Sequence, residues 1–285
     1  MTGATGQLGR LVVAALLDRG VPAQNIIAAV RTPEKAADLA AQGVQVRHAD
    51  YAQPETLAPA LEGADRVLLI SGTPGDRVAQ HANVIDAAKQ AGVQLIAYTG
   101  ILNADTTTML LAADHQATER LIKDSGLPYA FLRNGWYVEN YLMELEATLS
   151  GGFAGASGEG RFTPAARADF AEAAAAVLTD HGHETNVAYE LGGDKALTMD
   201  EAAALLGDVI GQRIAYTDMP VERYAAVLVR AGLPEPVAQV LADASAAIGR
   251  GELFTDSGDL QRLLDRPSTP IKATFENALS TEVPA

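Results

Sequence analysis

The sequence predicts a doubly wound α/β fold, in which a parallel β-sheet lies between two layers of helices and a smaller, mostly helical lobe follows. In the first half of the chain, short runs that are apolar at nearly every position alternate with helical patterns. Parallel strands give such runs because they are buried on both faces. The second half carries mostly helical patterns. Strand–helix alternation of the first kind is typical of doubly wound sheets.

Five strands and five helices are expected in the first half. The apolar runs predict strands at residues 26–30, 44–46, 67–70, 95–98 and 129–132. Helical spacing predicts helices at residues 7–19, 33–42, 54–62, 78–91 and 110–124. Just past each helix stands a glycine, which can take the left-handed conformation that ends a helix: Gly20, Gly43, Gly63, Gly92 and Gly126. Thr32 and Gln53 precede prolines and are expected N-caps, with Thr32 the better one.

The second half is predicted to be mainly helical, with one strand. Helices are expected at residues 137–149, 169–179, 198–210, 221–231 and 236–247, and a strand at 188–191. Thr198 and Glu201 have the spacing of a capping box. Glycines at 151, 152 and within 155–160 predict a turn-rich stretch, and the tail from Arg266 is expected to be a surface segment.

The composition excludes several classes of function. Asp and Glu number 36 against 21 Lys and Arg, so the net charge is −15. A field of that sign repels phosphate backbones and anionic lipids, so we expect neither a nucleic-acid nor a membrane partner. The absence of cysteine excludes disulfides and thiolate metal sites, and no metal site is predicted. The apolar runs are too short to cross a bilayer and no secretory signal is visible, so a cytoplasmic protein is expected.

A glycine-rich loop opens the chain and leads into the first helix. Gly3, Gly6 and Gly9 have a GxxGxxG spacing. Gly3 would permit the tight turn, Gly6 the close approach of a pyrophosphate, and Gly9 the packing of the helix against the sheet. Such a loop should follow a strand, yet only Met1 and Thr2 precede it here. The first strand is therefore expected to be a stub or to begin before this sequence.

The residues after the strands at 26–30 and 44–46 indicate which nucleotide would bind. NAD-specific sites carry an Asp or Glu about 20 residues beyond the glycines, on the ribose 2′-hydroxyl. Arg31 stands there instead, and Lys35 follows one turn later. A guanidinium pairs well with a 2′-phosphate, so NADP is favoured. Asp50, just beyond the strand at 44–46, could accept a hydrogen bond from the adenine amine.

The proton-transfer pair of ketone reductases is absent. Short-chain dehydrogenases that reduce ketones place a Tyr-x-x-x-Lys pair on a helix that corresponds to residues 110–124 here, after the strand at 95–98. By spacing to Glu119, His115 stands in place of the Lys and Leu111 in place of the Tyr. His115 is a weak candidate for a catalytic acid and equally a structural residue. A quinone, which becomes a weakly basic hydroquinone anion, fits this pattern, as does a protein without catalytic chemistry.

A polar and aromatic turn ends the strand at residues 129–132. Gly135 would let a flat ring approach the backbone, next to Asn134. Trp136 or Tyr137 could stack on a quinone, and Asn140 could donate to its oxygen. The alternative is that Trp136 is a packing residue between the two lobes.

Several segments resemble one family in particular, the NmrA-like branch of atypical short-chain dehydrogenases and, within it, the bacterial type 2 NADPH:quinone oxidoreductases. The resemblance covers nearly the whole chain. It is carried by TGATGQLG (2–9), AVRTPEKA (29–36), ADY (49–51), LLISG (68–72), AYTGILNADT (97–106), SGLPYAFLRNGWYVENY (125–141) and ARADFAEAAAAVL (166–178).

The resemblance implies a Rossmann-type fold that binds NADPH and passes hydride directly to a quinone, without flavin. It assigns site residues as follows: Gly3, Thr5, Gly6, Gln7 and Leu8 to the pyrophosphate, Arg31 to the 2′-phosphate, Ser71, Gly72 and Thr73 to the ribose, and Asn134 to Asn140 to the nicotinamide and quinone. Gly100 departs from the family, in which many members carry Ser, and leaves Thr99 as the hydroxyl at that strand end.

Two domains are expected from the change of pattern along the chain, and alternative functions stay open beside the one that the resemblance implies. Residues 1–150 are expected to bind the cofactor and residues 151–285 to form a substrate lobe, with part of 160–192 packing on the first domain. A dinucleotide-binding redox sensor without turnover is the main alternative function. A reductase or isomerase acting on another small aromatic compound is a weaker one. The oligomeric state is left open, a homodimer being one alternative.

Overall fold

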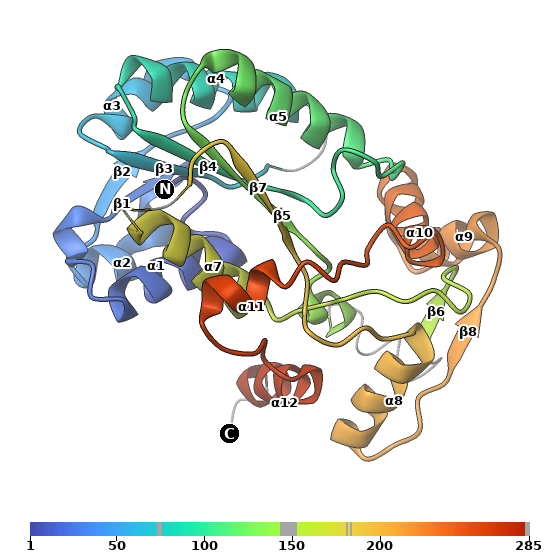
Figure 1. Ribbon diagram of the computed structural model, residues 1–285. Coiled ribbons are helices and arrows are strands. Elements are labelled where there is room, and N and C mark those ends of the chain that lie inside the picture. The colour runs from blue at the N-terminus through green and yellow to red at the C-terminus, as the bar shows by residue number, and fades with distance from the viewer. Residues whose placement is uncertain (73–75, 143–152, 181, 183, 283–285) are drawn as a thin grey trace.

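A parallel β-sheet forms the centre of the computed structural model, which describes residues 1–72, 76–142, 153–180, 182 and 184–282 (Figure 1). β1 (Ile27–Val30) pairs with β2 (Gln45–His48). A second set of strands follows in the order β3 (Arg66–Leu69), β4 (Leu95–Ile101), β5 (Tyr129–Asn134) and β7 (Val187–Leu191), all parallel. The expected α/β class is confirmed.

Met1 and Thr2 join the two sets of strands. Thr2 forms a parallel bridge with Ala29 of β1, and its amide donates to Leu68 of β3 at 2.9 Å. The Ala29 amide donates in turn to Met1 at 2.9 Å. These two residues therefore occupy the place of the expected first strand. The strand order becomes β2, β1, residues 1–2, β3, β4, β5, β7.

Helices cover both faces of the sheet, each over its own apolar core. On one face lie α1 (Gln7–Asp18), α2 (Ala37–Ala41), α7 (Arg167–Thr179) and α11 (Asp259–Leu264). On the other lie α3 (Leu57–Leu61), α4 (Arg77–Gln90) and α5 (Ala112–Ser125). The five glycines expected at helix ends all have positive φ, from 69° to 88°.

A second core lies beyond the carboxyl ends of the strands. It is built around β6 (Phe153–Gly155), which pairs with β8 (Tyr216–Asp218), and around the 3₁₀ helix η4 (Val138–Leu142). The helices of this part are α8 (Met199–Ile210), α9 (Val221–Arg230), α10 (Glu235–Gly249) and α12 (Ile271–Glu282). β7, α7 and α11 pack instead with the first half of the chain. Residue 150, the expected boundary, lies outside the described residues, so the division into domains stays a prediction.

Some local expectations are confirmed and others are wrong. The Thr198–Glu201 capping box is present. Thr32 makes no capping bond, and the expected helix at 33–42 is the 3₁₀ helix η2 (Pro33–Ala36) followed by the short α2. Residues 54–62 divide likewise into η3 (Pro54–Thr56) and α3. A third 3₁₀ helix, η1 (Ala23–Asn25), precedes β1.

The tail is not a surface segment. Arg266 pairs with the fully buried carboxylate of Asp169 at 2.9 Å, and α12 buries Phe275 completely. The helix expected at 137–149 is described only up to Leu142, where it is η4. Within the described ranges, no helix has the length and apolar character needed to cross a membrane.

Candidate functional site

The glycine loop has the close packing that a dinucleotide-binding turn requires. Gly3 has φ +63°, in the left-handed region, and the Gly6 amide donates to its carbonyl at 3.0 Å. A Cβ on Gly9 would lie 2.2 Å from the Gly3 oxygen, so any larger residue would push α1 off the loop. Gly6 and Gln7 are exposed where α1 begins. The first amides of a helix lack intrahelical partners, so this end can bind an anion.

A crevice is expected where the strand order reverses, between residues 1–2 and β3. The two loops that leave these strands lie against each other, since a Cβ on Gly3 would be 3.4 Å from the Cβ of Ile70. The glycine loop and residues 70–72 are thus the two walls of the crevice. The predicted pyrophosphate and ribose groups share this edge of the sheet.

The ribose wall, residues 70–72, is hydrogen-bonded to β4. The Ser71 amide donates to the Thr99 hydroxyl at 2.8 Å, and that hydroxyl lies 3.4 Å from the Ser71 hydroxyl. Thr99 is buried, so it supports the wall from beneath. Gly72 is half-buried beside Ser71, and Thr73 lies outside the described residues.

The residues predicted for the adenosine end follow β1 and β2. Arg31 and Lys35 are both exposed directly after β1. Arg10 donates to the Lys35 carbonyl at 2.6 Å and pairs with Asp38, which fixes this turn. Asp50 is half-buried after β2, and its Oδ1 accepts from the Ala52 amide at 3.0 Å. The side chains of Arg31 and Lys35 therefore face solvent at this end of the site, while the Asp50 carboxylate accepts a hydrogen bond within its own turn.

His115 is buried rather than open to the crevice. It is 5% exposed, and its Nδ1 lies 2.7 Å from the hydroxyl of Tyr98, which is fully buried on β4. Burial lowers the pKa of His115 to about 3, with Arg77 and His81 adding to the effect. Burial also raises the pKa of Tyr98. Both groups are therefore uncharged at neutral pH.

The turn after β5 gathers the remaining predicted residues. The Asn134 Nδ2 donates to the Tyr137 hydroxyl at 3.1 Å. The Arg167 guanidinium lies 5.1 Å from the centre of the Tyr137 ring and donates to the Asn140 Oδ1 at 3.4 Å. Burial raises the pKa of Tyr137. Trp136 is half-buried and packs against the second core.

Two buried polar atoms of this turn have no hydrogen-bond partner within the described structure: Oδ1 of Asn134 and Nε1 of Trp136. Unpaired buried groups of this kind are rare in proteins and cost roughly 1–3 kcal/mol each. Asn134 ends β5 at the carboxyl edge, so its free acceptor belongs to the region where a ligand is expected.

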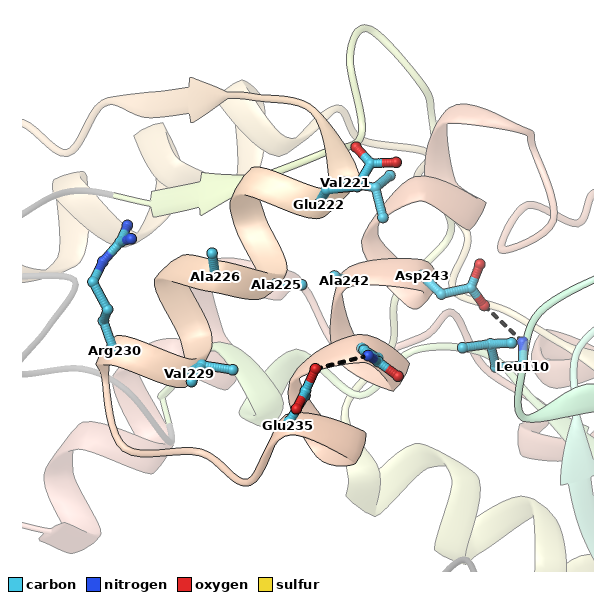
Figure 2. A pocket seen from close by; sticks show the side chains of 11 residues that line it. Leu110, Val221, Glu222, Ala225, Ala226, Val229, Arg230, Glu235, Ala242 and Asp243 are labelled. Carbon is cyan, nitrogen blue, oxygen red and sulfur yellow. Dashed lines mark hydrogen bonds between the residues drawn. The ribbon is translucent and has the colours of Figure 1, made fainter.

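A separate cavity of about 770 Å³ lies between α9 and α10 (Figure 2). Its lining is partly apolar, including Val221 and Val229, and partly acidic, including Glu222 and Asp243. The Asp243 carboxylate accepts from the Leu110 amide at 2.6 Å, which ties α10 to the loop before α5. None of the described residues that line it is a predicted site residue.

Sequence reasoning missed two residues that support the site, His81 and Arg167. Arg167 lies within a segment that carries the family resemblance, but it received no role. His81 accepts a bond from Gly72, nine residues earlier in the chain, at 3.1 Å. No local pattern marks either residue, because the contacts depend on how α4 and α7 pack.

The comparisons with known proteins agree with this geometry. The chain is 48% identical over 273 residues to quinone oxidoreductase 2 of Escherichia coli (strain K12), covering 95% of each protein. The structure of NADPH-dependent quinone oxidoreductase QOR2 with NADPH, from E. coli, matches with a TM-score of 0.93, 46% identity and 98% coverage of both chains. Triphenylmethane reductase of Citrobacter sp. matches with a TM-score of 0.90 and 43% identity, again over 98% of both chains.

A family model described as NAD(P)H-binding matches residues 3–181. This range begins at the first glycine of the loop and continues past α7, so it includes both walls of the crevice. The nicotinamide cofactor and the family expected from the sequence are thereby confirmed. The chain belongs to the NAD(P)H-binding family and is an NAD(P)H-dependent oxidoreductase.

Proposed function

We propose that this protein catalyses the NADPH-dependent two-electron reduction of quinones to hydroquinones, by direct hydride transfer and without flavin. The observation that carries the proposal is the state of His115. This imidazole is uncharged at neutral pH and bonded to Tyr98 inside the protein, so it is a poor proton donor. A ketone would become a strongly basic alkoxide that needs a donor. A quinone becomes a weakly basic hydroquinone anion, which takes its proton from water.

The crevice supports a set of cofactor contacts along its length. NADPH, when bound, supplies the hydride. The glycine loop and the first amides of α1 would hold the pyrophosphate, through Gly3, Thr5, Gly6, Gln7, Leu8 and Gly9. Arg31 and Lys35 would neutralise the 2′-phosphate, and Asp50 would accept from the adenine amine. Ser71 and Gly72 would line the ribose of the nicotinamide half, with Thr99 supporting them from behind.

The turn after β5 supports the substrate end of the site. Asn134 Oδ1 is a buried acceptor, and the carboxamide N–H of the nicotinamide, unlike a quinone, could donate to it and recover the cost of leaving it unpaired. Gly135 does not leave the space open for a ring, as the sequence suggests: a Cβ there would lie 2.9 Å from the Leu191 carbonyl oxygen, so the glycine lets β5 pack against the end of β7. Because Arg167 donates to Asn140 Oδ1, the Asn140 amide is oriented to donate through Nδ2, here to the quinone oxygen. Trp136 or Tyr137 would stack on the quinone ring.

The direct test follows the absorbance of NADPH at 340 nm with and without 1,4-benzoquinone, in protein shown by its visible spectrum to be free of flavin. We expect oxidation of NADPH only with quinone, at a rate proportional to the protein concentration. Tight NADPH binding without turnover would contradict the proposal and favour the redox-sensor alternative. The composition favours a cytoplasmic location for this activity.

Triarylmethane dye cations are a second class of acceptor whose reduction needs no acid from the protein. The related Citrobacter enzyme is a triphenylmethane reductase. Hydride added to the central carbocation gives a neutral product, so no proton is needed at all. The net charge of −15 would also attract a cationic substrate. Decolourisation of such a dye with NADPH, measured beside benzoquinone reduction, decides which acceptor is used faster.

A further inference from the structure

Side chains, rather than the strand ladder, hold the ribose wall of the crevice. The regular pairing of β3 ends at Leu69. Beyond it, the Ile70 amide donates to the Thr2 hydroxyl at 3.2 Å, and the Ser71 amide donates to the Thr99 hydroxyl at 2.8 Å. The position of the wall therefore depends on the few side chains that hold it.

Gly72 is held on both of its backbone groups by α4. Its amide donates to His81 Nε2 at 3.1 Å, and its carbonyl accepts from Arg77 at 3.3 Å. His81 Nδ1 lies 2.9 Å from the Thr118 hydroxyl, which donates to the Asp114 carbonyl at 2.8 Å. Because the hydroxyl proton is already engaged, Nδ1 carries the proton and Nε2 is free to accept. One neutral tautomer satisfies every bond.

The imidazole of His81 has little freedom to move. It is fully buried, between the rings of Tyr51 and Tyr98 in edge contacts with centroid distances of 6.1 and 5.5 Å. Neither ring nitrogen faces solvent or a predicted substrate group. A buried histidine with both nitrogens satisfied fixes its partners, so the Gly72 amide has one position relative to α4 and α5.

We propose that His81 is a positioning residue for the dinucleotide: through the Gly72 amide it sets the wall of the crevice that faces the nicotinamide half of NADPH. The inference rests on the proposed function for the placement of that half of the ligand. Replacing the His81 imidazole should therefore weaken the contacts to the nicotinamide half. The contacts to the adenosine half should be unaffected, because Arg31 and Lys35, which would make them, follow β1.

Three variants separate the two ring nitrogens. His81→Gln can place an acceptor near Nε2 and keep the bond to Gly72. His81→Asn reaches only as far as Nδ1 and keeps the bond to Thr118. His81→Leu keeps neither. We expect the Kd of NADPH to rise about fivefold to tenfold in His81→Asn and His81→Leu, and to stay within about twofold of wild type in His81→Gln. The kcat at saturating NADPH should change by less than about threefold.

A fragment of the cofactor distinguishes positioning from a general loss of structure. The Kd of 2′,5′-ADP, which lacks the nicotinamide half, should be the same in wild type and all three variants. Gln116→Met is the matched control, because it removes a 2.8 Å bond from α5 to the Ala104 carbonyl without touching residues 70–72. It should change neither Kd. If the affinities for NADPH and 2′,5′-ADP fell in parallel, the proposal would be overturned. It would also be overturned if His81→Gln and His81→Leu lost the same affinity for NADPH.

Wild-type protein provides a test that does not depend on the folding of variants. Nuclear magnetic resonance should detect scalar coupling between the Gly72 amide nitrogen and His81 Nε2 across their N–H···N bond. The Gly72 amide signal should shift on addition of NADPH and not of 2′,5′-ADP. Absence of the coupling, or an equal shift with both ligands, would overturn the proposal. Binding of NADPH without quinone turnover would contradict only the proposed function, because no readout for His81 except kcat depends on turnover.

Discussion

Arg31 is the residue that should decide between the two nicotinamide cofactors. It is exposed directly after β1, with Lys35 beside it. A guanidinium paired with a 2′-phosphate contributes roughly 1–3 kcal/mol. Arg31→Ala should therefore narrow the preference for NADPH over NADH by about tenfold or more, measured as the ratio of kcat/KM values. An unchanged ratio would remove Arg31 from the site. Arg19→Ala, at the far end of α1, is a suitable control.

The place of a candidate residue in the fold can be predicted from the sequence where its position along a strand determines that place. The glycine loop, Arg31 and Asn134 all follow from lying at carboxyl ends of parallel strands, which meet at one edge. The protonation of His115 did not follow, because burial against Tyr98 depends on the packing of α5 against β4. The same is true of His81, whose partners lie on three different elements.

Two helices carry buried neutral histidines, and this should make stability depend on pH. Burial lowers the pKa of His81 on α4 to about 4 and of His115 on α5 to about 3. In the unfolded chain both titrate near 6.5. Between these values the unfolded state binds more protons, so stability falls as the pH falls from about 6.5, and this loss levels off only below about 4 and 3 respectively. Each histidine contributes up to about 1.4 kcal/mol per pH unit.

Urea unfolding at pH 7, 6 and 5 measures this slope. His81→Gln and His115→Gln should each lower the slope of the free energy of unfolding against pH, because each removes about one proton from the uptake on unfolding. This expectation does not depend on how either variant changes stability at pH 7. Wild-type and variant free energies of unfolding that fall in parallel would show that the histidines are not the titrating groups.

At the level of elements, the strands were easier to predict than the helices. Burial on both faces gives each central strand a short apolar run that turn or polar residues bound on both sides. Helices that begin with a proline, such as those at residues 33 and 54, start instead as 3₁₀ turns too short to show a helical period. The tail was misjudged because its anchors are Arg266, bonded to Asp169, and Phe275, buried in the second core, and these contacts are distant in sequence.

The whole sheet depends on two residues at its centre. Met1 and Thr2 pair with β1 on one side and β3 on the other. Adding three or four apolar, β-branched residues before Met1 should extend this pairing along both neighbours and raise the Tm. Adding the same number of serines is the control, since a polar segment gains little from that buried position. Coincident melting curves for all three proteins would show that two residues suffice.

The short central pairing also divides the central sheet into two sets of strands. On one side, β1 and β2 are a two-strand flap; on the other, four strands form a continuous ladder. In native-state hydrogen exchange, the amides of the flap should open together at lower free energy than those of β4 and β5. A dinucleotide that spans the crevice would touch both sets, so its binding should slow exchange in the flap more than in the ladder. Bound cofactor would then hold the two sets of strands together from outside the sheet.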